Sequence, residues 1–458
     1  MATFGSTPKK VLNEVIGHKI GFSPDSKEIA FLRQTEQRTA DLVIANADGT
    51  NERRLVSFEK PISSYPPILV WSPDGKIIAC SFEHTGKLDL IAVRVADGTF
   101  ASISRPDRFS QGNFVWMPDS KSLLIVGKKE GDTPASQVWQ ISYPSGELRR
   151  ITNDANYYLD INVSSDGRSL AAVRIGQISH IWVMPTDDAS RLKQLTDGFE
   201  KYDGILNLSW MPDGKIIFNS NASGKSSVWT MKADGNNLRQ SVDEIKAEAV
   251  SPDGRFLVHR KGAVGAASLW QTDLKDASEK QLTKDADSDE DFLTFRDATF
   301  SPDGKWVVYS NRGTLWKVAI EGGEPAKILD KGGMFPAVSP DGKMIAFVSF
   351  GEQQPWSIAL VPFDGGEITN TFDTKTKSMV SNIQNLQWSP DGRAINYIAV
   401  NNAVSNIWRQ SAGGGPPIQV TEFDSGLIFN FAFSPDGKQL ALSRGSINSD
   451  IVLIKNSE

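Results

Sequence analysis

Carboxylates recur along this chain at a regular spacing, and such groups can serve acid–base catalysis or bind a metal ion. Ten aspartates stand in one short phrase, best represented by Ser-Pro-Asp-Gly-Lys, about every 46 residues. They are Asp25, Asp74, Asp119, Asp166, Asp213, Asp253, Asp303, Asp341, Asp391 and Asp436. The neighbouring proline and glycine are typical of a tight turn in which the carboxylate bonds to nearby backbone. Ten equivalent sites cannot all be catalytic, so we interpret these aspartates as structural turn residues.

A second acidic group has the spacing that opens a calcium-binding loop. It contains Asp285, Asp287 and Asp289. However, Glu290 occupies the position of the loop's glycine, and Arg296 stands where a bidentate glutamate is needed. A block of like charges is usually hydrated, so the sequence favours a solvated acidic loop and no metal site.

Nucleophilic and histidine-based catalysis are also poorly supported by the sequence. The chain has no Gly-x-Ser-x-Gly pentapeptide, which an α/β-hydrolase type of peptidase requires. Its four histidines are His18, His84, His180 and His259, and we interpret them as isolated residues and not as ligands of one metal ion. We therefore expect no catalytic residue, no metal, no cofactor and no enzymatic activity. A metal-dependent polysaccharide lyase or hydrolase remains the alternative function.

The turn phrases are flanked by strand-like segments. A Phe, Trp or Val precedes most of the turns and an aliphatic run follows, as in "WSPDGKIIACSF" at 71–82, which is typical of a β-hairpin. A third strand follows, such as "SVWTMKADG" at 227–235, and then a short fourth strand. Four strands in a repeat of this length are typical of a propeller blade. The sequence therefore predicts an all-β fold, a β-propeller of ten four-stranded blades.

The two ends of the chain suggest how such a ring closes. The last repeat supplies three strands, and "STPKKVL" at 6–12 is similar to a fourth strand without the preceding three. We expect the N-terminal strand to complete the last blade, because closure hides the exposed edges of an open array. The expected domain is a single ten-repeat propeller over 1–458. Two smaller propellers in tandem, 1–240 and 241–458, remain the alternative.

Composition limits the classes of partner. The net charge is −6 and basic runs are short, which argues against nucleic-acid binding. The sequence contains no apolar stretch of membrane-spanning length and no signal peptide at "MATFGSTPKK", so we expect no membrane insertion by this chain. Its one cysteine, Cys80, lies in a strand-like segment and is interpreted as a small buried hydrophobic residue. We expect a monomer.

The repeat resembles a known family. "SPDGKMIAF" at 339–347, "IWVM" at 181–184 and "LRRIT" at 148–152 are similar to the TolB-type, WD40-like propeller repeat, also called the PD40 repeat. Relatives with this repeat include periplasmic partner-binding propellers, the propellers of prolyl-oligopeptidase-like and tricorn-like peptidases, and sensor domains of bacterial kinases and transcription regulators. "ANADGTNERRL" at 45–55 is most similar to the last group. The resemblance implies a non-enzymatic bacterial sensor or interaction module, extracytoplasmic if it belongs to a larger sensor protein.

Binding is expected on the face that carries the longer loops. In a propeller, the fourth-to-first and second-to-third strand loops share one face, and rigidly supported loops commonly carry specificity. Aromatic residues and arginines in these loops suit a protein partner. The candidates are Tyr65, Arg108, Tyr157, Tyr158, Tyr202, Phe292, Arg296, Phe335 and Phe429. We predict that a protein, peptide or small ligand binds at this face and at the channel mouth.

Overall fold

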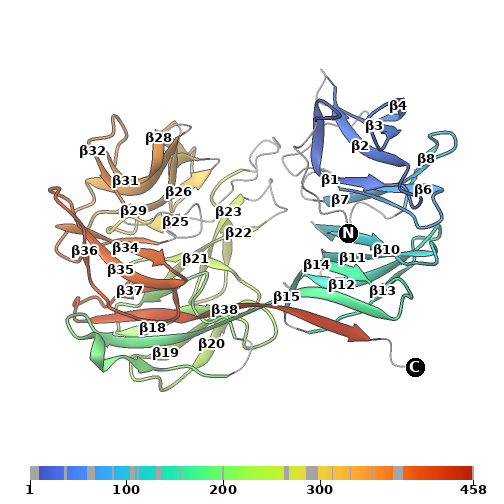
Figure 1. Cartoon of the computed structure of the whole chain (residues 1–458). Helices are drawn as coiled ribbons and strands as arrows, with labels where there is room; N and C mark the ends of the chain where they lie inside the picture. Colours follow the sequence, from blue (N-terminus) through green and yellow to red (C-terminus); the bar gives the residue numbers. More distant parts are fainter. Residues whose placement is uncertain are drawn as a thin grey trace. The chain divides into compact units, whose positions relative to one another are not determined.

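In the computed structural model of the chain, the regular secondary structure consists almost entirely of β-strands (Figure 1). It describes residues 10–35, 39–58, 68–84, 87–103, 109–110, 113–129, 136–154, 156–198, 201–261, 268–284, 298–311, 313–330, 332–351, 354–374 and 385–455. In these ranges the single helical element is a 3-10 turn, η1 (Ala189–Arg191). None of the described segments forms a helix with the length and apolar character needed to span a membrane.

Each of the ten turn phrases joins the first two strands of an antiparallel hairpin. The hairpins are β1 (Val15–Phe22) with β2 (Glu28–Gln34), β5 (Leu69–Trp71) with β6 (Ile77–His84), β10 (Phe114–Trp116) with β11 (Ser122–Lys129), β14 (Tyr157–Val163) with β15 (Ser169–Pro185), β17 (Leu208–Trp210) with β18 (Lys215–Ser220), β21 (Ala247–Val250) with β22 (Phe256–Lys261), β25 (Ala298–Phe300) with β26 (Trp306–Asn311), β29 (Gly333–Val338) with β30 (Met344–Gly351), β33 (Leu386–Trp388) with β34 (Ala394–Asn401), and β37 (Leu427–Phe433) with β38 (Gln439–Lys455). The all-β propeller fold is therefore confirmed.

Outer strands complete most of these hairpins as blades. The third and fourth strands are β3 (Ala40–Asn46) and β4 (Arg53–Phe58), β7 (Lys87–Arg94) and β8 (Phe100–Ser102), β12 (Gln137–Ser142) and β13 (Leu148–Arg150), β19 (Ser227–Lys232) and β20 (Arg239–Val242), β23 (Ser268–Asp273) and β24 (Glu279–Gln281), β27 (Thr314–Ala319) and β28 (Ala326–Leu329), β31 (Gln354–Pro362) and β32 (Asn370–Asp373), and β35 (Val404–Ser411) and β36 (Ile418–Gln419). Two short strands, β9 (Phe109–Ser110) and β16 (Lys193–Gln194), pair with β11 and β15.

The described residues form nine sheets, so the count of ten four-stranded blades is not confirmed. The fourth and tenth hairpins share one sheet, because the long strands β15 and β38 pair with each other in the order β14-β15-β38-β37. These two strands cross the boundary between two compact units. We call residues 1–176 with 449–458 the four-sheet unit and residues 177–448 the six-sheet unit.

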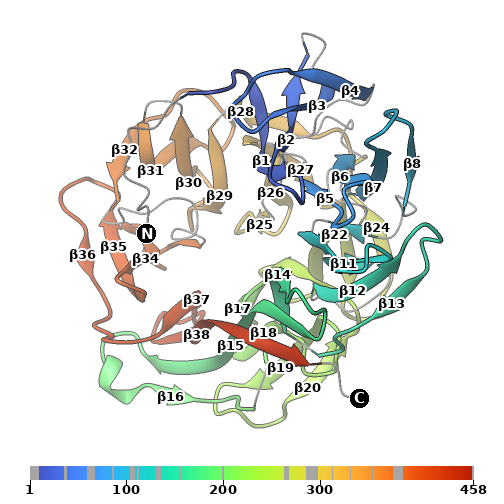
Figure 2. The ribbon, with the colours of Figure 1, turned by 45° about the vertical axis from the view of Figure 1, so that its right-hand side comes forward.

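The six-sheet unit is a closed cycle of sheets. Six hydrophobic clusters each join two neighbouring sheets, and the sheet of β37, β38, β15 and β16 lies between the β33–β36 sheet and the β17–β20 sheet (Figure 2). Trp388 Nε1 donates to Ala337 O of the preceding sheet at 3.0 Å. Trp210 Nε1 makes the same bond to Ala432 O of β37, also at 3.0 Å. The tenth hairpin therefore precedes the fifth in the cycle, as an ordinary preceding blade would.

The expected closure by the N-terminal strand is wrong for the described residues. In the six-sheet unit, β38 pairs with β37 on one side and with β15 on the other. Residues 10–12 form no strand, and Leu12 packs against the first sheet beside Phe31. Residues 6–9 of the expected strand lie outside the described residues. The single ten-repeat domain, and its alternative of 1–240 and 241–458, stay predictions.

The turn geometry explains why the Ser-Pro-Asp-Gly phrase recurs. At Asp391, the Ser389 hydroxyl donates to Oδ1 at 2.5 Å, and the backbone N–H of Arg393 donates to the same oxygen at 3.1 Å. Gly392 takes a φ of 69°, in the left-handed region that glycine enters at little cost. The structure therefore places this carboxylate in the role of a turn-closing acceptor. The backbone bond recurs in the other turns, but Met117 and Met211 replace the serine at Asp119 and Asp213.

The turns predict how stability depends on pH. The Ser301 hydroxyl and the Lys305 N–H hold the pKa of Asp303 below its ordinary value of 3.8. The equivalent serine hydroxyl and lysine N–H of their own turns lower the pKa of Asp341 and Asp436. A lowered pKa stabilises the fold above pH 3.8, and this contribution is lost as the pH falls below 3.8 through the folded-state pKa. Urea unfolding between pH 3 and 7 should show this acid loss, and Asp303→Asn should reduce it.

Asp203 provides the opposite case. Burial raises its pKa, although the Ser220 hydroxyl donates to its carboxylate at 2.5 Å. Its protonation therefore favours the fold, and this contribution is lost as the pH rises through the raised pKa. In the same urea series, the wild-type free energy of unfolding should decrease somewhat as the pH rises toward neutral, and Asp203→Asn should abolish this decrease. The decrease at acid pH should remain in this variant. An unchanged pH profile in both variants would contradict the assignment.

The four-sheet unit is held together in the same way, with clusters between successive sheets. Cys80 is fully buried in the first of these clusters, and burial raises the pKa of its thiol. The interpretation as a small hydrophobic residue is therefore confirmed. We predict that the native protein does not react with a disulfide reagent such as Ellman's reagent until the unit unfolds in urea. Rapid reaction in buffer would contradict this burial.

Candidate functional site

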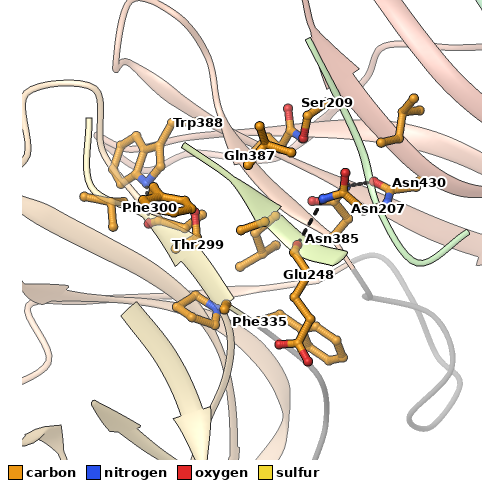
Figure 3. A pocket seen from close by; sticks show the side chains of 18 of the residues that line it. Asn207, Ser209, Glu248, Thr299, Phe300, Phe335, Asn385, Gln387, Trp388 and Asn430 are labelled. Carbon is orange, nitrogen blue, oxygen red and sulfur yellow. Dashed lines mark hydrogen bonds between the residues drawn. The ribbon is translucent and has the colours of Figure 1, made fainter. Parts of the chain in front are cut away.

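The first strands of the six-sheet unit surround a pocket with a volume of about 360 Å³ (Figure 3). Its described lining comes from residues in or beside β17, β21, β25, β29, β33 and β37, so every sheet of the cycle contributes. A propeller places these innermost strands around its central channel. The pocket is therefore the channel of this unit, and its volume is at the small end of the range for ligand sites.

One part of the wall consists of carboxamides and hydroxyls. Gln387 Nε2 donates to Phe431 O at 2.6 Å, and Asn385 Nδ2 donates to the same carbonyl at 3.1 Å. Asn207 Nδ2 donates to Glu248 O at 3.1 Å. These bonds join neighbouring sheets and fix the side chains in place. The carboxamide oxygen of Asn207 is buried and has no hydrogen-bond partner among the described residues.

Aromatic rings form the apolar part of the wall. Phe300, Phe335 and Trp388 line the pocket. Phe335 lies at a bulge in β29, where the register with β30 shifts between Met334 and Ala337, and its φ of 52° is unusual for a residue with a side chain. Such backbone strain is retained where the surroundings enforce it, frequently at functional positions.

Glu248 is the one charged residue among the described lining residues, and it is paired. Arg260 Nε lies 3.1 Å from Glu248 Oε1, and the two side chains are 14% and 6% exposed. Arg260 also donates to Ser310 O of the next sheet at 2.9 Å. Nearby, burial raises the pKa of Tyr309 to about 12, so its phenol is neutral at neutral pH. The described wall therefore offers polar groups without a free charge.

The structure places the predicted loop residues in several environments. Phe335 lines the pocket, and Phe429 lies in β37 next to the pocket residue Asn430. Tyr202 is half-buried, and its backbone N–H donates to Asn221 Oδ1 at 2.8 Å. Tyr65, Arg108, Phe292 and Arg296 lie outside the described residues, as does the acidic loop at 285–290.

The two remaining candidates belong to the four-sheet unit. Tyr157 is half-buried. Tyr158 is 4% exposed in a hydrophobic cluster, and its hydroxyl donates to Asp154 Oδ2 at 2.8 Å, which suits a packing role. As binding residues, all nine loop candidates stay predictions.

Sequence reasoning missed the polar wall of the pocket, although a signal was present. Asn207, Asn385 and Asn430 stand at the same repeat position, in "NLSW", "NLQW" and "NFAF" before the turn. Their sheets follow one another in the closed cycle as β33, β37 and β17, but only the pairing of β38 with β15 makes them neighbours. No comparable sequence pattern points to Glu248, because its place in the neutral wall depends on its pairing with Arg260.

Among the described residues, no group of three His, Cys, Asp or Glu side chains could hold a metal ion. His259 is buried, and its Nε2 lies 2.9 Å from Thr272 Oγ1. Burial lowers the pKa of His259 and of His180, which favours neutral imidazoles. In the described part of the chain, these histidines have the environments of structural side chains.

Comparison with known proteins supports the expected repeat family. Residues 19–205 match the family model described as the TolB beta propeller domain, PD40. An uncharacterised protein of Agrobacterium fabrum is 25% identical over 204 residues, which is 41% of this chain and 67% of that protein. The assignment to the bacterial sensor group stays a prediction.

Two further relatives are peptidases by name. Dipeptidyl-peptidase 5 of Porphyromonas gingivalis is 29% identical over 32% of this chain and 22% of its own length. The peptidase YuxL of Bacillus subtilis, itself described as uncharacterised, is 26% identical over 43% of this chain and 28% of its own length. These relatives contradict the expectation that the protein is not an enzyme. That expectation depended on the missing Gly-x-Ser-x-Gly pentapeptide. The absence of this motif tests for one kind of catalytic segment, and does not test whether a propeller takes part in peptide hydrolysis.

Proposed function

We propose that this chain, which carries a TolB-type β-propeller domain at residues 19–205, binds polypeptide segments in the channel of its six-sheet unit and serves in peptide hydrolysis. The observation that carries the proposal is the neutral channel wall, with carboxamides and hydroxyls beside aromatic rings. Carboxamides donate and accept hydrogen bonds as the peptide group does, and aromatic rings provide apolar contact area for side chains.

The relatives support the hydrolytic part of the proposal. Two named peptidases match parts of this chain, but the chain covers 22% and 28% of their lengths. Substrate-selecting propellers are compatible with this pattern, because rigid scaffolds commonly present substrates to chemistry carried elsewhere. Binding of a protein partner is the second candidate, and the likeness to the TolB propeller domain favours it.

The proposal is tested with fluorescein-labelled, denatured casein as the polypeptide. Fluorescence anisotropy should show saturable binding to the purified protein, and release of small labelled fragments over hours would report hydrolysis. Gln387→Ala and Phe335→Ala should each weaken binding about tenfold or more, because each removes a contact from the channel wall.

Gln281→Ala is the matched control for Gln387→Ala. Gln281 lies in the outer strand β24 and donates to a backbone carbonyl, that of Thr283, at 2.8 Å. This variant should bind casein like the wild type. Binding that is lost equally in both variants would argue against the channel, and an absence of both binding and hydrolysis would refute the proposal. Binding without hydrolysis would favour the second candidate.

A further inference from the structure

We infer that the channel of the six-sheet unit accepts the uncharged interior of an extended polypeptide and rejects charged chain ends. This inference rests on the proposed function and adds the chemical class of segment that the site selects. It follows from the charge and the hydrogen-bonding groups of the described wall.

The described wall is neutral because its one charged residue, Glu248, is paired with Arg260. The Glu248 carboxylate accepts from Arg260 Nε at 3.1 Å and 3.4 Å through its two oxygens. Both side chains are largely buried, so the guanidinium neutralises the carboxylate at the pocket wall. An α-ammonium or α-carboxylate entering this wall would lose its hydration and find no free counter-charge among the described residues. Burial of such a charge is costly.

The polar groups suit uncharged amides. Ser209, Thr299 and Gln387 occupy the same position in β17, β25 and β33, two residues before each turn phrase. In the intervening sheets, Ala249 and Ala337 hold that position, so polar and small apolar side chains alternate around this part of the channel. Hydroxyls and carboxamides can pair with either the N–H or the C=O of a peptide group.

The unpartnered oxygen of Asn207 is a second, independent sign of a missing ligand group. Asn207 is 5% exposed, and its nitrogen is already used by Glu248 O. A buried acceptor without a donor costs about 1–3 kcal/mol, which a ligand N–H can recover. An extended chain presents N–H and C=O groups to both sides, so it can offer such a donor to the wall.

Isothermal titration calorimetry with three tetra-alanine peptides tests the inference on the wild-type protein. The first peptide is acetylated and amidated, the second has a free amine and an amidated end, and the third is acetylated with a free carboxylate. We expect the fully capped peptide to bind, and each charged peptide to bind about tenfold more weakly or worse. Maltose, a neutral ligand of another class, should not bind.

Equal or tighter binding of a charged peptide would overturn the inference, and so would maltose binding more tightly than the capped peptide. Failure of all three peptides would also overturn it. In that case, the casein experiment tests the proposed function separately. If casein still binds, only the inference is wrong; if casein does not bind, the proposed function is wrong as well.

A variant provides a second measurement. Glu248→Gln leaves the Arg260 guanidinium without its carboxylate partner. The affinity for the peptide with a free carboxylate should therefore rise about tenfold relative to the affinity for the capped peptide. Glu279→Gln is the control, because Glu279 pairs with Lys261 at the outer strand β24. An unchanged preference in Glu248→Gln would contradict the charge argument. If that variant does not fold, as judged by circular dichroism, the wild-type peptide series decides alone.

Discussion

Replacing Gly445 with alanine is expected to open the closed cycle of the six-sheet unit. A Cβ at this position would lie 1.8 Å from Ile178 O, on the neighbouring strand β15, and 2.9 Å from Ser179 Cα. Backbone atoms cannot give way as a flexible side chain can, so β38 and β15 must separate locally. Because this pairing completes the last sheet of the cycle, we expect the free energy of unfolding to fall by about 3 kcal/mol or more.

Gly176→Ala is the matched control for this prediction. Gly176 lies in the same long strand β15, but an added Cβ would approach only Asn156 Oδ1, at 3.9 Å. Its stability in urea should stay close to that of the wild type. Gly445→Ala should also lose casein binding, because the channel wall needs the closed cycle. A Gly445→Ala protein as stable as the control would show that the β15–β38 pairing does not hold the unit together.

The second large effect is expected from Arg260→Met. This change leaves the Glu248 carboxylate buried and unpaired, and also removes the bond to Ser310 O. Breaking a buried ion pair by removing one partner costs roughly 3–5 kcal/mol, since the remaining charge is left without compensation. Urea unfolding followed by circular dichroism measures the loss.

The double variant Glu248→Gln with Arg260→Met separates charge from packing. With both charges gone, most of the lost stability should return, because neutral groups of similar size avoid the cost of an isolated carboxylate. The coupling energy from the four proteins then measures the pair. Additive losses in the two single variants would mean that the two side chains act independently, against the geometry of the channel wall.

The local structure could be predicted from the sequence because its causes are local. Each hairpin is specified by an aspartate that accepts the backbone N–H two residues later and by flanking β-branched or aromatic residues. In most copies a serine hydroxyl two residues before the aspartate and a glycine directly after it complete the turn. Asp391, Ser389 and Gly392 illustrate this, with all their bonds inside one turn. The family assignment came from the same local phrases. The turn phrases do not indicate whether the protein is an enzyme. The expectation of no activity is contradicted by the relatives that are named as peptidases.

Only the tertiary structure decided how the hairpins are joined and where a pocket forms. The sequence favoured residues 6–12 as the closing strand, yet β15 pairs with β38 across more than half of the chain. Strand edges present the same backbone groups whatever their sequence, so local pattern cannot choose between partners. The neutral channel depends partly on a local pair, because Glu248 and Arg260 face each other across the bulged hairpin of β21 and β22. Its carboxamide wall depends on asparagines in or beside β33, β37 and β17 becoming neighbours. These asparagines belong to segments that are distant in the sequence, which packing alone brings together.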